Sequence, residues 1–143
     1  MTRLPLLSYE KMTPDQKTLH DEILSGPRNH IVGPMHTWFL NPSYGALIQK
    51  VGAFCRYGTS LLPRLSELTI MIVARHWDTD VEWVAHRKTS LKNGISEKIL
   101  TAIENNQRPH FIRQDEELIY DLTISILERK GLSDDLFQKA ETK

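Results

Sequence analysis

The sequence predicts an all-α fold, a compact bundle of six to seven helices. Apolar residues recur every three or four positions in several segments, which is the spacing of one helix face. Helix-start and helix-stop signals, such as Thr13-Pro14 and Asn93-Gly94, bracket these segments. We find no convincing strand pattern. We expect the 143 residues to form one domain, 1–143, which is long enough to bury a core.

The chain is expected to begin with an extended arm, residues 1–12, in which Leu4, Pro5, Leu6 and Leu7 are available for packing. Thr13-Pro14-Asp15-Gln16 then places threonine as the N-cap, proline at the first helical position and glutamine three residues after the cap. This is a strong helix start. The helix should run to about Leu24 and stop at Gly26-Pro27.

A polar loop separates this helix from a second one that starts at Asn41-Pro42 and reaches about Tyr57. Gly58 is expected to end it. The apolar residues that follow the 3.6-residue period are Leu47, Ile48, Val51 and Phe54.

The third main helix is predicted over about 64–77, after Leu62-Pro63. It is apolar nearly all round, so it belongs in the centre of a domain or in a subunit interface. A β-strand is the competing prediction for Thr69–Val73. The flanking charges of Glu67 and Arg75, and a length compatible with a helix, favour the helix.

The remaining helices are predicted from helix-cap residues and from apolar stripes in the sequence. The predicted starts and ends are Thr79 or Asp80 to Asn93-Gly94, Ser96 to about Glu104, Asp115 to Lys130, and Ser133 onward. The chain stops soon after the last helix begins, at Lys143, which leaves open whether that helix is complete.

Composition limits the classes of function. Eighteen basic and eighteen acidic residues give a formal net charge of zero, which argues against broad binding to nucleic-acid phosphates. The single cysteine, Cys55, forms no intramolecular disulfide and suits a reducing cytosol. No stretch has the length and apolarity of a membrane span. We therefore expect a soluble, cytoplasmic protein that binds neither nucleic acid nor a membrane.

Three ionisable residues form the candidate site. Glu82 and His86 are four residues apart, so their side chains share one helix face. Glu67 lies nineteen positions before His86, in the most apolar helix of the chain. A buried carboxylate is costly unless it is paired, and histidine exchanges protons near neutral pH. The pattern therefore suggests a carboxylate–imidazole cluster with acid–base chemistry.

Plainer interpretations of these residues stay open. Thr79 and Glu82 fit a capping box, in which Glu82 is structural. Glu67 could be exposed in the first turn of its helix, favoured by the helix dipole, or could pair with Arg64 instead of His86. The opposite face of the helix that carries Glu82 is apolar, and a polar face on a short helix is usually solvated.

Other chemistries have weaker support. Cys55 is expected to be a core residue rather than a nucleophile. His76, Asp78, Glu82 and His86 have the ligand types for a metal but match no metal motif, so we expect no metal and no cofactor. The helix that starts at Ser96 has one lysine and two glutamates, a poor surface for DNA phosphates.

About residues 30–105 resemble the carboxymuconolactone decarboxylase family, which includes the alkylhydroperoxidase D-like proteins. The matching residues are Leu62-Pro63-Arg64, Glu67-Leu68-x-Ile70, Ala74-Arg75, Glu82-Trp83-x-x-His86 and Gly94-Ile95-Ser96, with Gly33-Pro34 and Asn41-Pro42 upstream. The resemblance implies an all-α subunit that assembles as a homo-oligomer, a trimer or a hexamer, around its central helices.

The resemblance implies one of two chemistries. The peroxidase branch uses a Cys-x-x-Cys motif, whose positions here are Thr79 and Glu82. Thiol peroxidation needs both a thiolate and a resolving thiol, so this branch is disfavoured and Cys55 is not a proven substitute. The decarboxylase-like branch has the Glu-Trp-x-x-His pattern present here. It implies a small carboxylated lactone, or a related acid, as substrate.

For the decarboxylase-like branch we expect three roles. His86 would move a proton at the substrate carbon, while Glu82 or Glu67 would hold its tautomer. Arg75 or Arg56 would bind a substrate carboxylate. The candidate apolar walls and second acid–base group are Trp83, Trp38, Met35 and His36. A non-catalytic, oligomeric small-molecule-binding protein with the same scaffold is the alternative from another class.

Overall fold

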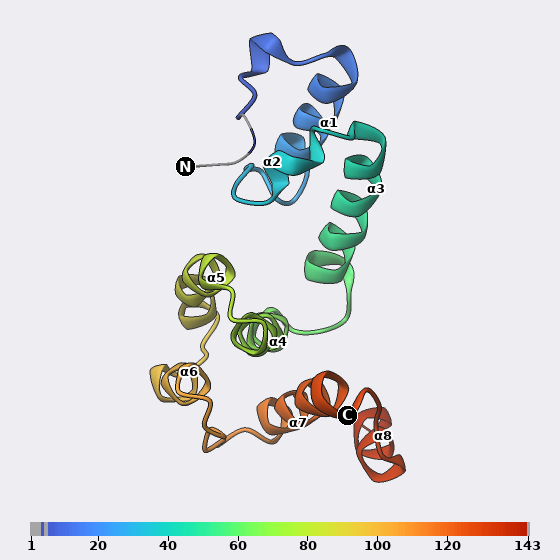
Figure 1. Cartoon of the computed structure of the whole chain (residues 1–143). Coiled ribbons are helices and arrows are strands. Elements are labelled where there is room, and N and C mark those ends of the chain that lie inside the picture. Colours follow the sequence, from blue (N-terminus) through green and yellow to red (C-terminus); the bar gives the residue numbers. More distant parts are fainter. Residues whose placement is uncertain (1–3, 5, 143) are drawn as a thin grey trace. The chain divides into compact units, whose positions relative to one another are not determined.

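The all-α prediction is confirmed: in the computed structural model, every regular element within the described residues, 4 and 6–142, is helical (Figure 1). These residues form the α-helices α1 Pro14–Ser25, α2 Met35–Trp38, α3 Pro42–Ala53, α4 Pro63–His76, α5 Asp80–Lys92, α6 Glu97–Glu104, α7 Gln114–Arg129 and α8 Asp134–Glu141. A 3-10 turn, η1 Tyr9–Lys11, and a π-helical turn, η2 Phe54–Gly58, complete them.

Helix α2 was not predicted from the sequence; it is a single turn with no side-chain cap. Within residues 4 and 6–142, no helix is long and apolar enough to cross a membrane. The contacts group the chain into two compact units, Met1–Ser60 and Leu61–Lys143. We describe each unit by itself.

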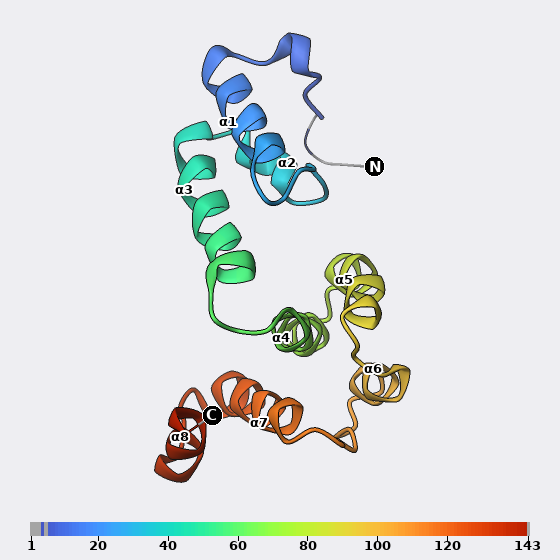
Figure 2. The same ribbon diagram turned by 180° about the vertical axis from the view of Figure 1, so that it is seen from behind.

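In the first unit, α1 and α2 both pack on α3 (Figure 2). The capping box at the start of α1 is confirmed, because Thr13 Oγ1 accepts from the Gln16 backbone and Gln16 Oε1 accepts from the Thr13 backbone at 2.9 Å. The core of this unit consists of Met12, Leu19, Ile23 and Phe39. Within the arm, Leu7 packs against that core, Leu4 and Leu6 are exposed, and Pro5 lies outside the described residues.

Helix α3 turns its predicted apolar stripe outward. Leu47, Val51 and Phe54 are more than half exposed, while the buried residues of α3 are Gly45 and Gln49. Close packing explains this orientation. A Cβ atom on Gly45 would lie 2.7 Å from a Leu19 methyl group and 2.8 Å from Trp38, so α3 approaches its neighbours through its small face.

The end of this segment also differs from the prediction. The α-helix stops at Ala53 and continues as the π-helical turn η2, instead of remaining α-helical to about Tyr57. Cys55, expected in the core, is exposed in that turn. Gly58, which was expected to end the helix, is the last residue of η2, and Thr59 follows it as the C-cap.

In the second unit, α4 is the central helix and contacts α5, α6 and α7 (Figure 1). The competing strand over Thr69–Val73 is not formed, because those residues are part of α4. The buried core is Leu68, Met71, Ile72, Ile95, Ile99, Leu100 and Ile103. A single chain therefore covers most of α4, and the apolar character of this helix does not by itself require a subunit interface.

Candidate acid–base site

Glu67 is placed by the first half of α4. Pro63 occupies the first helical position, and the five consecutive residues Arg64 to Leu68 are buried. Glu67 is only 4% exposed, so it is not a solvated first-turn charge. A carboxylate at this depth is stable only with hydrogen-bonding partners.

Helix α5 supplies the other two residues by turning its polar face inward. Ser90 on this face is fully buried, while Val81 and Val84 on the apolar face are exposed. This is the reverse of an ordinary surface helix. The Thr79–Glu82 capping box is not formed, because the Thr79 side chain makes no cap hydrogen bond and instead donates to the Ala74 carbonyl. Glu82 therefore does not act in a capping box with Thr79.

The two helices place the His86 imidazole between two carboxylates. His86 Nδ1 lies 2.8 Å from Glu67 Oε2, a hydrogen bond, and His86 Nε2 lies 3.5 Å from Glu82 Oε2. The side chains of Glu67, His86 and Glu82 are 5%, 12% and 40% exposed. The cluster therefore runs from a buried carboxylate, through a mostly buried imidazole, to a carboxylate that reaches solvent.

This geometry determines how the imidazole can act. An ionised carboxylate only accepts hydrogen bonds, so an ionised Glu67 requires hydrogen on Nδ1, which in the neutral ring leaves the lone pair on Nε2. Nε2 is also the nitrogen on the more exposed side, toward Glu82. A histidine fixed in this way can take a proton at Nε2 and return it, while its oriented partner stabilises the imidazolium.

Arg64, the other candidate partner of Glu67, is engaged elsewhere. Its guanidinium donates to Asp115 at 2.7 Å and to Glu116 at 2.5 Å, which ties α4 to α7. The hydrogen bond from Arg64 holds the pKa of Asp115 below its ordinary value. Glu67 therefore belongs with His86.

Arg75 and Trp83, two predicted substrate-binding residues, line one hollow of about 220 Å³ where α4 ends and α5 begins. The other residues of its lining are Ala74, Asp78, Thr79, Asp80 and Glu104. Arg75 already donates a hydrogen bond to Asp78. The hollow thus combines a guanidinium, an indole and carboxylates, and its lining includes none of Glu67, Glu82 or His86.

The remaining predicted residues belong to the Met1–Ser60 unit. Met35 is buried in α2, and the His36 ring lies 6.5 Å from that of Phe39. Trp38 is partly buried, with the Arg28 guanidinium 5.6 Å from its ring. Arg56 lies over the Tyr57 ring at 5.1 Å. Their roles in a substrate site stay predictions.

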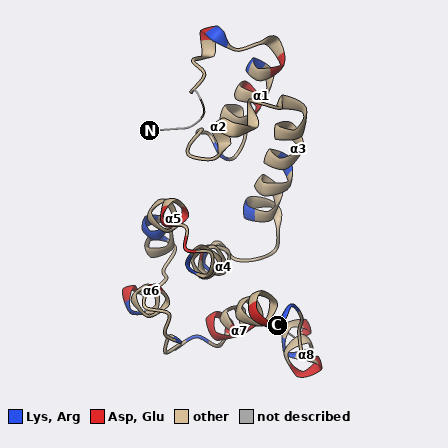
Figure 3. Ribbon diagram, in the orientation of Figure 1, with Lys and Arg blue, Asp and Glu red and all other residues tan. Residues whose placement is uncertain are grey.

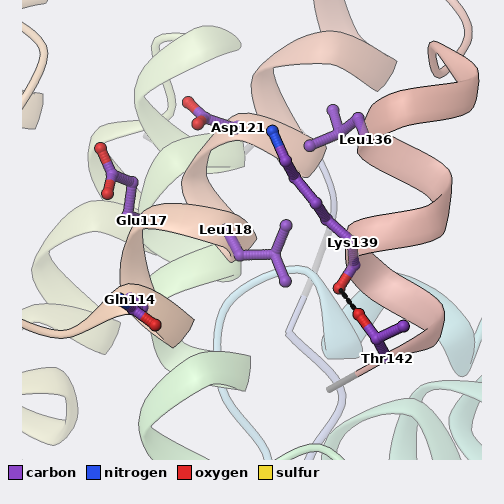
Figure 4. A pocket seen from close by; sticks show the side chains of 7 residues that line it. All are labelled: Gln114, Glu117, Leu118, Asp121, Leu136, Lys139 and Thr142. Atoms are coloured by element: carbon purple, nitrogen blue, oxygen red, sulfur yellow. Dashed lines mark hydrogen bonds between the residues drawn. The ribbon is translucent and has the colours of Figure 1, made fainter.

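A larger hollow that the sequence analysis did not anticipate, of about 480 Å³, lies between α7 and α8 (Figure 4). Glu117 and Asp121 on its α7 wall both accept hydrogen bonds from Arg108. Lys139 on its α8 wall pairs with Asp135 at 2.7 Å. Because these charges already have partners within the chain, the hollow has no ionic group left over for a ligand.

Within residues 4 and 6–142, no group of three or more His, Cys, Asp or Glu side chains is placed to hold a metal ion. The alternative metal set of His76, Asp78, Glu82 and His86 therefore has no support. Comparison with protein-family models found no match, and comparisons with curated proteins and with solved structures found none either.

Proposed function

We propose that this chain is a carboxymuconolactone decarboxylase-like enzyme that uses acid–base chemistry on a small carboxylated lactone or a related acid. The observation that carries the proposal is the hydrogen bond of 2.8 Å between buried Glu67 and His86 Nδ1, with Nε2 toward Glu82. Helix α5 buries Ser90 of this polar face and exposes Val81 and Val84, an arrangement that does not favour folding and that fits a face retained for the cluster.

In the proposed reaction, the bond between the substrate carbon and its carboxylate breaks and CO₂ leaves. The electron pair of that bond stays on the substrate, delocalised toward the lactone carbonyl. His86, which first takes up a proton at Nε2 from water through Glu82, then delivers that proton from Nε2 to the carbon. Glu67 keeps the ring oriented, and Glu82, at 3.5 Å and 40% exposed, passes a proton from water back to Nε2.

Substrate binding requires a positive group near the leaving carboxylate. Arg75 is the candidate in the same unit as the cluster, in a hollow that also contains the Trp83 indole. Because Arg75 is already paired with Asp78, a substrate carboxylate would have to share or replace that partner. Arg56, the other candidate from the sequence, belongs to the Met1–Ser60 unit, and its role stays a prediction.

A non-catalytic, oligomeric small-molecule-binding protein is the alternative from another class, in which Glu67 and His86 would only stabilise the fold. The hydroperoxidase-like alternative requires two thiols, and the chain has only Cys55. Peroxide turnover with a dithiol as reductant should therefore be absent.

The test is ultraviolet-monitored turnover of γ-carboxymuconolactone by the wild type, His86→Ala and His110→Ala. His110 is exposed in a loop of the same unit, so it is a matched control for loss of an imidazole. We expect His86→Ala to be slower by about 10²–10⁴-fold and His110→Ala to be unchanged. Full turnover by folded His86→Ala would remove the proposed mechanism. No turnover by the wild type would exclude this substrate and favour the binding protein.

A further inference from the structure

Of the two carboxylates that contact the His86 ring, Glu82 is the one that can move. Its side chain is 40% exposed and lies 3.5 Å from Nε2. The capping box that would anchor it to Thr79 is not formed, and among the described residues its ion-pair partner is His86. Glu67, in contrast, is 5% exposed and lies 2.8 Å from Nδ1. Glu67 is therefore held by the fold, whereas Glu82 can turn toward solvent.

Whether Glu82 is attracted to Nε2 depends on one proton. An ionised Glu67 requires hydrogen on Nδ1, so Nε2 carries either a second hydrogen or a lone pair. In the imidazolium, an N–H group faces the Glu82 carboxylate and attracts it. In the neutral ring, a lone pair faces the carboxylate and the two repel each other. The contact at 3.5 Å therefore fits the protonated ring, in which Glu82 covers Nε2.

The other charged groups of α4 and α5 are directed elsewhere. On α4, Arg64 and Arg75 are each paired with carboxylates outside the cluster. Helix α5 bears both acidic and basic residues (Figure 3). Of these, Arg87 pairs with a carboxylate of α6, and Asp80 and Lys88 are exposed. Among the described residues of the Leu61–Lys143 unit, the two glutamates of the cluster are thus the charged groups in contact with the ring.

The contact between Glu82 and Nε2 is weak enough for a ligand to replace it. An ion pair with a partly exposed partner contributes little to stability, because water competes for the charged groups. A dissolved carboxylate has the same charge and the same two acceptor oxygens as the Glu82 side chain. It can therefore take the volume that the Glu82 carboxylate leaves, and no preformed cavity is needed at Nε2.

We propose that Glu82 is an internal occupant of a carboxylate-binding position at His86 Nε2, and that it turns toward solvent when a ligand carboxylate binds there. The inference rests on the proposed function for the identity of the ligand, a small carboxylated acid, but the displacement itself requires no turnover. Glu82 thus covers the ring in the free protein. A substrate bound in its place has its leaving carboxylate beside the Nε2 hydrogen that replaces it on the carbon.

The fraction of molecules in which Glu82 is turned away sets the size of the expected effect. A ligand binds only these molecules, so its apparent affinity is reduced by that fraction. Removing the Glu82 carboxylate makes every molecule competent. For an ion pair with a partly exposed partner, this should raise the apparent affinity for a small carboxylate by roughly two- to sixfold.

The experiment is a titration with acetate at constant ionic strength and about pH 6, where histidine is commonly protonated. The ¹⁵N signals of the His86 ring are followed in the wild type, Glu82→Gln and Asp80→Asn. Asp80 is exposed in the same first turn of α5, so Asp80→Asn is a matched control for loss of one negative charge. We expect acetate to shift the His86 signals, with roughly two- to sixfold tighter binding in Glu82→Gln only.

Three results would overturn the proposal. Equal acetate affinity in the wild type and Glu82→Gln would show that Glu82 does not compete for Nε2. Equal gains in Glu82→Gln and Asp80→Asn would attribute the change to net charge rather than to displacement. His86 signals that acetate shifts in none of the three proteins would show that Nε2 does not bind a carboxylate. Tighter binding in Glu82→Gln only, without turnover of γ-carboxymuconolactone, would support the displacement and reject the proposed reaction.

Discussion

Helix α4 takes part in two buried ionic contacts that differ in kind. Near its start, the Arg64 guanidinium donates to both Asp115 and Glu116 of α7. One turn later, Glu67 accepts a hydrogen bond from His86 of α5. Both contacts join α4 to a neighbouring helix through charged groups that, apart from Asp115 at 37% exposed, are largely removed from water.

The two contacts differ in whether the basic side chain can gain and lose a proton. An arginine keeps its proton at any ordinary pH, and two carboxylates occupy the guanidinium, so the α4–α7 contact is a fixed tie. Histidine gains and loses its proton near neutral pH, and Nε2 of His86 faces a carboxylate that reaches solvent. Two similar buried pairs on one helix thus have different consequences: one stabilises the fold, and the other can carry chemistry.

The largest effect on stability is expected at the contact of Arg64 with Asp115 and Glu116. Arg64→Met would leave Glu116, 3% exposed, without its guanidinium partner, and should lower the free energy of unfolding by about 3–5 kcal/mol. Urea denaturation measures this. Arg108→Met is the control, because Arg108 also binds two carboxylates but is 50% exposed, and it should cost less than about 1 kcal/mol. Equal losses of unfolding free energy in Arg64→Met and Arg108→Met would contradict the claim that the buried contact stabilises the fold more than the exposed one.

The second effect concerns the Glu67–His86 pair. His86→Ala removes the imidazole from a buried carboxylate and should cost about 2–3 kcal/mol. Replacing both residues, as Glu67→Leu with His86→Leu, should cost less than the sum of the single changes, because no buried charge is left. Additive costs in this double-mutant cycle would show that the two side chains do not interact.

The third effect is a dependence of stability on pH. Because the hydrogen bond from Arg64 lowers the pKa of Asp115 below its ordinary 3.8, the unfolded chain binds a proton there more readily than the folded chain. The stabilisation is complete above pH 3.8 and is lost as the pH falls through the lower, folded value. Asp115→Asn should flatten this acid limb in urea titrations. An unchanged limb would remove Asp115 as its cause.

The smallest effect on stability is expected at the exposed end of the cluster. Glu82 is 40% exposed and 3.5 Å from the ring, so Glu82→Gln should change the free energy of unfolding by less than about 1 kcal/mol. If Glu82 passes protons to Nε2, turnover should nevertheless fall several-fold. A large loss of stability with unchanged turnover would show instead that Glu82 is structural.

Local signals predicted the helices well. The capping box at Thr13 and the N-cap side chains of Asn41 and Ser96 all form as expected. Gly94 adopts the positive φ expected of a helix end. These features depend on residues a few positions apart, so the sequence contains them directly.

The face that each helix turns toward the core was harder to predict, because it depends on tertiary packing. Both α3 and α5 turn an apolar face outward, whereas a hydrophobic pattern alone would bury that face. The pairing of Glu67 was undecided from spacing, and only the placement of α7 shows why Arg64 was not its partner. At the end of α7, Lys130 takes a left-handed φ of 55°, a conformation that is more common for glycine.

The most direct test of the central claim is the tautomer of His86, measured from its ¹⁵N chemical shifts in the wild type and in Glu67→Gln near neutral pH. We expect the wild-type ring to carry hydrogen on Nδ1 with a lone pair on Nε2, and the Glu67→Gln ring to lose this preference. A wild-type ring with hydrogen on Nε2 only, or one unaffected by Glu67→Gln, would contradict the claim that Glu67 prepares His86 for acid–base chemistry.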